Sequence, residues 1–166
     1  IYVSNDLVFL IEENELYTRG LYAALIGSGK IIGRIPNAFD PLKDKFWTNE
    51  DGTKFAVVSS KNTLYIYSAM ENPELSYLKP EGVFPFSEID GNCCDFKIFW
   101  SGASSPVLWC DSFSFENPKR VSYVYSIKEK MDFLFKTENS ISPVVSPDRK
   151  KIAYTDAGKF FVYDIS

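Results

Sequence analysis

Short apolar runs separated by polar turns make up most of this chain, and one arrangement of them occurs twice. The two copies span Asn49–Tyr67 and Ser146–Tyr163. In each copy a polar turn with an aspartate, Asp51 or Asp148, precedes an apolar run, and a second turn leads to a run of aromatic and branched residues. These apolar runs are Phe55–Val58 and Leu64–Tyr67 in the first copy, and Ile152–Tyr154 and Phe160–Tyr163 in the second. Such runs bounded by turns are typical of β-strands, so the pattern predicts a repeated two-strand unit.

The spacing of the two copies leaves room for a third between them. Asp51 and Asp148 are 97 residues apart, about twice the ~40–50 residues of a propeller blade. The intervening repeat is expected to begin near Phe99–Ser104, and a weaker copy is expected to begin at Val3–Asp6. The strands predicted for these two repeats are Val107–Trp109, Val121–Tyr125, Leu7–Ile11 and Leu16–Tyr17.

Further strands are predicted at the outside of the repeats. They are Lys30–Ile35, Leu75–Leu78 and Met131–Phe135. The last repeat stops at Ser166 with no outer strand, and the first lacks an innermost strand unless Ile1–Val3 supplies it. Because Ile1 is not an initiator methionine, a processed, trimmed or excised sequence is expected.

Ser146-Pro147-Asp148, followed by 150–154 and then Val162-Tyr163-Asp164, resembles the WD40-like propeller repeat of the TolB type. The propeller domains of the prolyl oligopeptidase and dipeptidyl peptidase IV families use similar repeats. Asn49–Tyr67 resembles the repeat less closely, with Asn-Glu in place of Ser-Pro, and the other two repeats match in pattern alone. The resemblance implies an all-β, antiparallel β-propeller of about four blade-like repeats. It would form a single domain over 1–166, or a segment of a larger propeller.

The composition agrees with a chain of β-strands and limits the classes of partner that we expect. The chain has 14 Phe, 10 Tyr and 3 Trp in 166 residues, is 45% hydrophobic and 24% charged, and contains no apolar run of the ~18 residues that a membrane span needs. Its net charge of −4 does not provide the excess of basic side chains that binds the phosphate backbone of a nucleic acid. We therefore expect neither a membrane span nor a nucleic-acid partner. A protein or peptide ligand is expected, together with the remainder of a larger propeller or a second copy of the chain.

The sequence contains no histidine, which excludes Ser-His-Asp and Cys-His catalysis within it. Glu88, Asp90 and Asp95 form a carboxylate group that fits a solvated loop better than a calcium site, because its spacing matches no calcium motif. Nothing in the spacing brings two carboxylates together as a glycosidase pair. No catalytic, cofactor-binding or metal-binding residue is assigned, and whether the chain belongs to an enzyme stays open.

Three cysteines allow several states. Cys93, Cys94 and Cys110 are expected to be buried free thiols on strands, since free cysteine behaves as a small hydrophobic residue. Two alternatives stay open: a bridge from Cys110 to Cys93 or Cys94, and a bond between the adjacent pair. The redox compartment is therefore not indicated.

The function favoured by these features is a non-catalytic binding or scaffold module that presents a propeller face, around the central channel, to a protein or peptide ligand. The alternative implied by the resemblance is the substrate-gating propeller of an oligopeptidase-like serine hydrolase whose catalytic residues lie outside this chain. A downstream segment with a Gly-x-Ser-x-Gly motif would favour that alternative. A third hypothesis is a sugar-binding propeller. Trp47, beside a turn and expected to be exposed, is the candidate ligand-binding residue.

Overall fold

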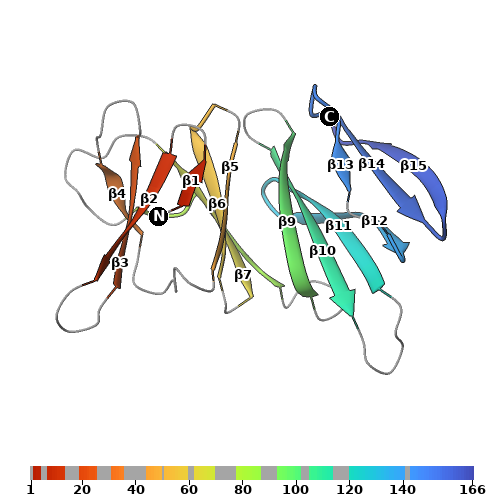
Figure 1. The fold of residues 1–166 in the computed structure, drawn as a ribbon, viewed down its shortest axis with the longest axis horizontal. Coiled ribbons are helices and arrows are strands. Elements are labelled where there is room, and N and C mark those ends of the chain that lie inside the picture. The colour runs from red at the N-terminus through yellow and green to blue at the C-terminus, as the bar shows by residue number, and fades with distance from the viewer. Residues whose placement is uncertain are drawn as a thin grey trace. The chain divides into compact units, whose positions relative to one another are not determined.

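Figure 1 shows the fold of the chain in a computed structural model. It describes residues 2–4, 7–13, 19–25, 31–35, 44–49, 51–59, 62–69, 78–86, 93–101, 105–113, 120–140 and 143–166. The chain divides into two compact units, Ile1–Phe86 and Ser87–Ser166. The expectation of a single domain over 1–166 stays a prediction.

The first unit contains two four-stranded antiparallel sheets in which each strand pairs with the next along the chain. The strands of one sheet are β1 (Tyr2–Ser4), β2 (Leu7–Glu13), β3 (Arg19–Leu25) and β4 (Ile31–Ile35). Those of the other are β5 (Lys45–Thr48), β6 (Lys54–Ser59), β7 (Thr63–Ser68) and β8 (Gly82–Pro85).

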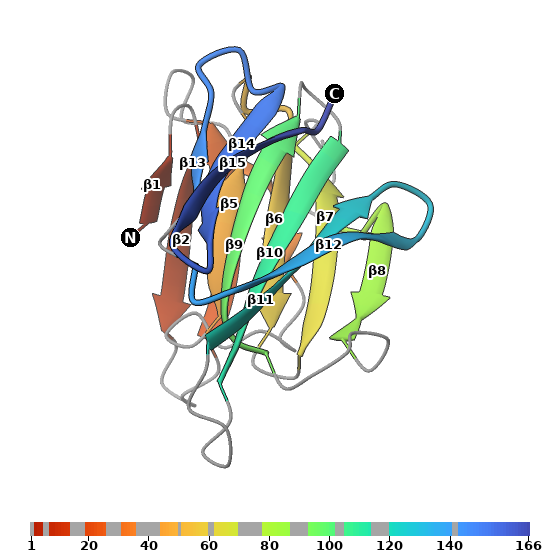
Figure 2. The ribbon, with the colours of Figure 1, turned by 90° about the vertical axis from the view of Figure 1, so that its right-hand side faces the viewer.

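The second unit contains one four-stranded and one three-stranded sheet of the same antiparallel plan. The first has β9 (Cys93–Ser101), β10 (Ser105–Phe113), β11 (Arg120–Ile127) and β12 (Met131–Glu138). The second has β13 (Val144–Val145), β14 (Lys151–Asp156) and β15 (Lys159–Asp164). Figure 1 shows β14 between β13 and β15 in this last sheet, and Figure 2 draws the same strands from the right-hand side of that view. The prediction of an all-β chain with antiparallel sheets is confirmed.

Most strands expected from the repeats are present. The runs at 7–11, 55–58, 64–67, 107–109, 121–125, 131–135, 152–154 and 160–163 lie in β2, β6, β7, β10, β11, β12, β14 and β15. Residues 31–35 form β4 and residues 2–4 form β1, the first strand of the same sheet, while the last sheet has three strands in the described residues. Leu16-Tyr17 and residues 102–104 lie outside the described residues, and Phe99–Ser101 form the end of β9.

The outer strand of the second repeat was predicted in the wrong place. Leu75–Leu78 was expected, but the strand that pairs with β7 is β8, formed by Gly82–Pro85. Residues 75–77 lie outside the described residues, and Leu78 lies in no strand. Leu78 is nevertheless buried, and its backbone N–H donates to the carbonyl of Arg34 at 2.8 Å. Pro80 follows, and proline cannot donate a hydrogen bond to a ladder. At Leu78 the apolar residue marks core burial and not a strand.

The two sheets of each unit are joined by an apolar core. In the first unit Ile32 and Ile35 of β4 pack with Phe55 and Val57 of β6, and Phe55 stacks on Tyr67 with ring centroids 5.0 Å apart. Since Ile32, Ile35, Phe55 and Val57 are all 0% exposed, this core removes their apolar surface from water, which is the main stabilising term.

The core of the second unit is centred on Trp109. Its ring meets Phe135 of β12 at 6.2 Å and Tyr154 of β14 at 6.0 Å between centroids, both edge-on. Phe135 also stacks on Tyr154 at 4.7 Å and contacts Tyr163 of β15 at 4.6 Å. These aromatic contacts fix one face of the β13–β15 sheet against the β9–β12 sheet.

Candidate binding surface

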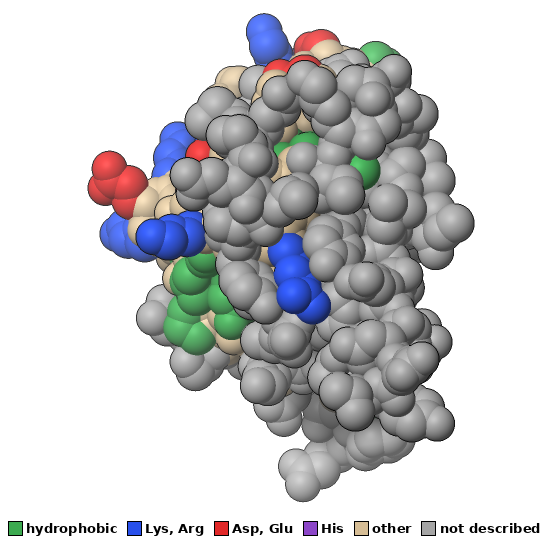
Figure 3. Space-filling view, turned by 90° about the vertical axis from the view of Figure 1, so that its left-hand side faces the viewer, with side chains coloured by type: hydrophobic (Ala, Val, Ile, Leu, Met, Phe, Trp, Pro, Cys, Tyr) green, Lys and Arg blue, Asp and Glu red, His purple; other side chains and the backbone are tan. Residues whose placement is uncertain are grey.

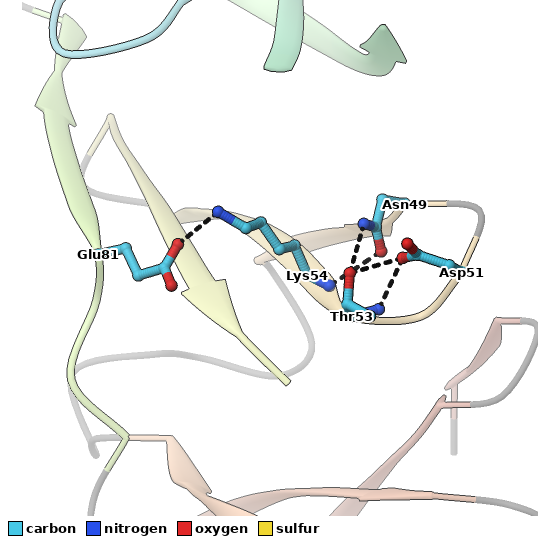
Figure 4. Close-up of polar contacts among 5 residues, drawn as sticks. All are labelled: Asn49, Asp51, Thr53, Lys54 and Glu81. Atoms are coloured by element: carbon cyan, nitrogen blue, oxygen red, sulfur yellow. Dashed lines mark hydrogen bonds and ion pairs between the residues drawn. The ribbon is translucent and has the colours of Figure 1, made fainter. Parts of the chain in front are cut away.

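The two copies of the repeated turn share the hydrogen bonds made by their backbone N–H groups, position by position. In the first, the N–H of Asn49 donates to the Lys54 carbonyl at 3.0 Å, and the Lys54 N–H donates to Asn49 Oδ1 at 2.9 Å (Figure 4). In the second, the N–H of Ser146 donates to the Lys151 carbonyl at 2.9 Å, and the Lys151 N–H donates to Ser146 Oγ at 3.0 Å. An amide oxygen in one turn and a hydroxyl oxygen in the other thus fill the same position.

The aspartate of each turn is held by its own loop. Asp51 Oδ1 accepts from the N–H and the hydroxyl of Thr53 at 3.0 and 2.6 Å. Asp148 Oδ1 accepts from the Ser146 hydroxyl at 2.6 Å and the Lys150 N–H at 3.2 Å. The side-chain hydrogen bond from Thr53 lowers the pKa of Asp51, and that from Ser146 lowers the pKa of Asp148. Both groups stay anionic at neutral pH, which suits a turn and not a general acid.

A buried polar network lies on the neighbouring strands β10 and β11. Asp111 is 3% exposed, and its Oδ1 accepts from Trp109 Nε1 at 2.9 Å and from the Ser122 hydroxyl at 2.5 Å. Its Oδ2 pairs with Arg120 at the edge of the network. Asp111 and Ser122 are direct partners across the ladder, and Trp109 shares their face because alternate residues of a strand point the same way. These groups orient Trp109 in the core. The sequence signal was an acidic residue inside an otherwise apolar strand, and it was missed.

The other face of the β13–β15 sheet carries exposed apolar side chains. Phe160 is 86% exposed, Val162 66% and Val144 66%. The ladder places Val144 opposite Ala153 and Ala153 opposite Val162, so these side chains form one row across the sheet. Of the seven large hydrophobic side chains that are exposed among the described residues, four lie on β13 and β15, counting Phe161 at 41%. Such a concentration marks a contact surface rather than ordinary surface scatter.

A polar cavity of about 300 Å³ lies within the second unit. It is lined by Ser101, Ser105, Val107, Ser126, Lys128, Leu134, Tyr163, Asp164, Ile165 and Ser166. Ser101 Oγ donates to the Ile165 carbonyl at 2.8 Å, and a hydrogen bond from the Ser166 hydroxyl lowers the pKa of Asp164. Its volume is at the lower end of the range for ligand sites, and its hydroxyl-rich lining suits a small polar molecule.

Trp47, the candidate ligand-binding residue, lies on β5 opposite Ala56 and is half-buried. Its role in binding sugar stays a prediction, tested by glycan binding of a Trp47→Ala variant. Glu88 and Asp90 lie outside the described residues, so their grouping with Asp95 is not tested. Asp95 itself lies on β9, where its Oδ1 accepts from the N–H of Phe96 at 2.9 Å.

Cys110 is disulfide-bonded, so the expectation of a free thiol at this position was wrong. The pairing of β9 with β10 places the backbone of Cys93 opposite Ser112, two residues along β10 from Cys110. The partner of Cys110 lies outside the described side chains. A bridge from Cys110 to Cys93 or Cys94 was one of the alternatives that the sequence left open, and this alternative agrees with a disulfide at Cys110.

Charge on the described surface is mixed. On the face drawn in Figure 3, the described Lys and Arg side chains are interspersed with acidic and apolar ones. None of the described segments forms a helix with the length and hydropathy needed to cross a bilayer.

The sequence matches no protein-family model and no curated protein. Among solved structures, it is similar to the crystal structure of a proposed 6-phosphogluconolactonase from Bacteroides fragilis, with a TM-score of 0.45 and 9% sequence identity. The alignment covers 96% of this chain and 51% of that one, so the chain spans about half the length of that protein.

Proposed function

We propose that this chain is a non-catalytic binding module built of β-propeller blades of the WD40-like type, and that it binds a protein or peptide. The blade plan is supported by three four-stranded meanders and a three-stranded one, in each of which successive strands pair antiparallel. The matching hydrogen bonds of the turns at Asp51 and Asp148 support a common repeat.

The observation that carries the binding function is the apolar surface of the β13–β15 sheet. We define this open surface by Val144, Phe160 and Val162, whose exposed fractions are 66%, 86% and 66%. Exposed apolar side chains gathered on one sheet face favour association, because covering them releases the water that hydrates them. Phe160 supplies a large, rigid ring of the kind that anchors interfaces.

The experiment is a selection of peptides from a displayed library against the immobilised chain. We expect enrichment of peptides with apolar and aromatic residues, and loss of their binding to a Phe160→Lys, Val162→Lys double variant. Val83→Lys is the matched control, since Val83 is a 50% exposed residue of β8, a strand of the other unit. No enrichment, or enriched peptides that bind the double variant as well as the parent chain, would contradict the proposed function.

A further inference from the structure

The disulfide of Cys110 lies inside the core of the second unit. Cys110 is 0% exposed and belongs to β10, which pairs with β9 on one side and with β11 on the other. Its neighbours along β10 are Trp109 and Asp111, which are 1% and 3% exposed and are joined by the hydrogen bond from Trp109 Nε1. The bond is therefore attached to the strand that carries the aromatic and polar centre of this unit.

The bond closes a loop within the sequence. Cys110 has two possible partners among the three cysteines, Cys93 and Cys94, which are the first two residues of β9. With either partner, the loop contains most of β9 and the residues that lead from it to β10. A covalent link between these two points limits the conformations of the unfolded chain, and so it stabilises the folded one.

Burial distinguishes a structural disulfide from a catalytic or regulatory one. A disulfide is reduced when a thiolate attacks one of its sulfur atoms, so catalytic and regulatory bonds lie where a thiolate can reach them. Cys110 is 0% exposed, and hydrogen-bonded strands flank β10 on both sides. A thiol in solution therefore reaches the sulfur of Cys110 only after this sheet opens. This position is typical of a structural disulfide.

We propose that the disulfide of Cys110 is a structural bond of the second unit, and that the chain folds and functions in an oxidising compartment. Such compartments are the bacterial periplasm, the lumen of the endoplasmic reticulum and the extracellular space, whereas glutathione and thioredoxin keep thiols reduced in the cytosol. The S–S bond forms when two cysteine thiols of the folding chain pass two electrons and two protons to the disulfide of an oxidoreductase, which is reduced to a dithiol. This proposal does not depend on the binding function proposed above.

Loss of the bond is expected to weaken the core around Trp109. The ring of Trp109 meets that of Tyr154 on β14 at 6.0 Å between centroids, so a change in β10 reaches the β13–β15 sheet. A reduced Cys110 still fills its place in the core, but it no longer links β10 to the start of β9. The reduced chain is therefore expected to be less stable than the bridged chain, with the same residues in its core.

The first measurement is thermal unfolding of the intact chain, followed by near-UV circular dichroism in the bridged state and after reduction with dithiothreitol. Reduction is expected to lower the Tm of the parent chain by about 6–12 °C. Cys110→Ala is the control: it loses the sulfur atom but has no bond at this position to reduce, so its Tm should not change with the reductant. A fully reduced parent chain with the Tm of the bridged chain would overturn the proposal.

The second measurement compares the rates at which dithiothreitol reduces the native chain and the chain unfolded in urea, with the released thiols trapped by a maleimide. The native rate is expected to be lower by about a hundredfold or more, because the sheet has to open before the bond is attacked. Equal rates would overturn the structural role, since the bond would then be as accessible as a regulatory one.

The compartment is tested by producing the chain in the cytosol and in the periplasm of a bacterium, and by trapping free thiols at lysis. The bond uses two of the three cysteines, so the bridged chain has one free thiol and the reduced chain has three. We expect one trapped thiol per chain from the periplasm, three from the cytosol, and a lower Tm for the cytosolic product. A cytosolic product that is already bridged, or one that is reduced and as stable as the periplasmic product, would overturn the assignment to an oxidising compartment.

Discussion

Replacing Asp111 with alanine is expected to destabilise the second unit strongly. The change removes the acceptor of Trp109 Nε1 and of the Ser122 hydroxyl, in residues that are 1% and 0% exposed. Each buried polar group left without a partner costs about 1–3 kcal/mol, so the two together cost about 2–6 kcal/mol. Arg120, whose side chain is 45% exposed, adds little because water replaces its partner.

The assay is urea unfolding followed by near-UV circular dichroism, which reports the packing of buried aromatic rings. In a parallel thermal scan, a loss of about 3 kcal/mol should lower Tm by roughly 6–12 °C for a chain of this length. Asp132→Ala is the matched control: its carboxylate pairs with Lys130 at 3.1 Å where both side chains are about half exposed or more, and such pairs are worth ~0–1 kcal/mol. If Asp111→Ala loses no more stability than Asp132→Ala, the network does not hold Trp109 in place.

Three other predictions concern the turns and the disulfide. The pKa values of Asp51 and Asp148 are lowered, so these carboxylates stabilise the fold above the ordinary pKa of 3.8. This stabilisation is lost as pH falls through the lower pKa values of the folded state. Below pH 4, the urea midpoint should therefore fall less steeply with pH in Asp148→Asn than in the parent chain. Gly52 and Arg149 occupy the same position of their turns, with φ of 70° and 56°. In urea unfolding, Gly52→Ala should lower the free energy of unfolding by about 1 kcal/mol, and Arg149→Gly should raise it by up to about 1 kcal/mol. Changes of the opposite sign would contradict the shared requirement for positive φ. Peptide mapping without reduction should find Cys110 bridged, and a free Cys110 would contradict the bond in the structure.

The turns were the part of the fold that local sequence encodes most directly. An Asp-Gly pair specifies a tight turn because glycine adopts positive φ and aspartate accepts from the backbone two residues on. Both features are present at Asp51 and Gly52, and Asp148 repeats the aspartate bond without a glycine. Strands next to these turns were therefore located well from the sequence.

Features that depend on contacts between distant residues were not predicted. Leu78 lies in a sequence pattern that suggested a strand, yet it is buried by packing against the core of the first unit. Its backbone N–H donates a hydrogen bond to the carbonyl of Arg34 in β4. Asp111 is acidic, and its burial is understood once β11 brings Ser122 opposite it. A strand's own sequence does not say which strands will lie beside it, so neither residue could be interpreted locally.

For the same reason, the open surface could not be predicted from the sequence. Phe160–Tyr163 has the apolar composition of a buried strand and resembles Leu64–Tyr67, in which Leu64 and Tyr67 are 0% and 1% exposed. Only the exposed fractions of Phe160 and Val162 distinguish the two runs and identify a candidate binding surface.

Binding of a library-selected peptide to the parent chain and to the Phe160→Lys, Val162→Lys double variant, followed by fluorescence anisotropy, tests the central claim most directly. The account predicts saturable binding that the double variant loses about tenfold or more and that the Val83→Lys control keeps, since Phe160 and Val162 are 86% and 66% exposed on the open surface. Equal binding by the double variant and the parent chain would contradict the claim that this face is a binding surface.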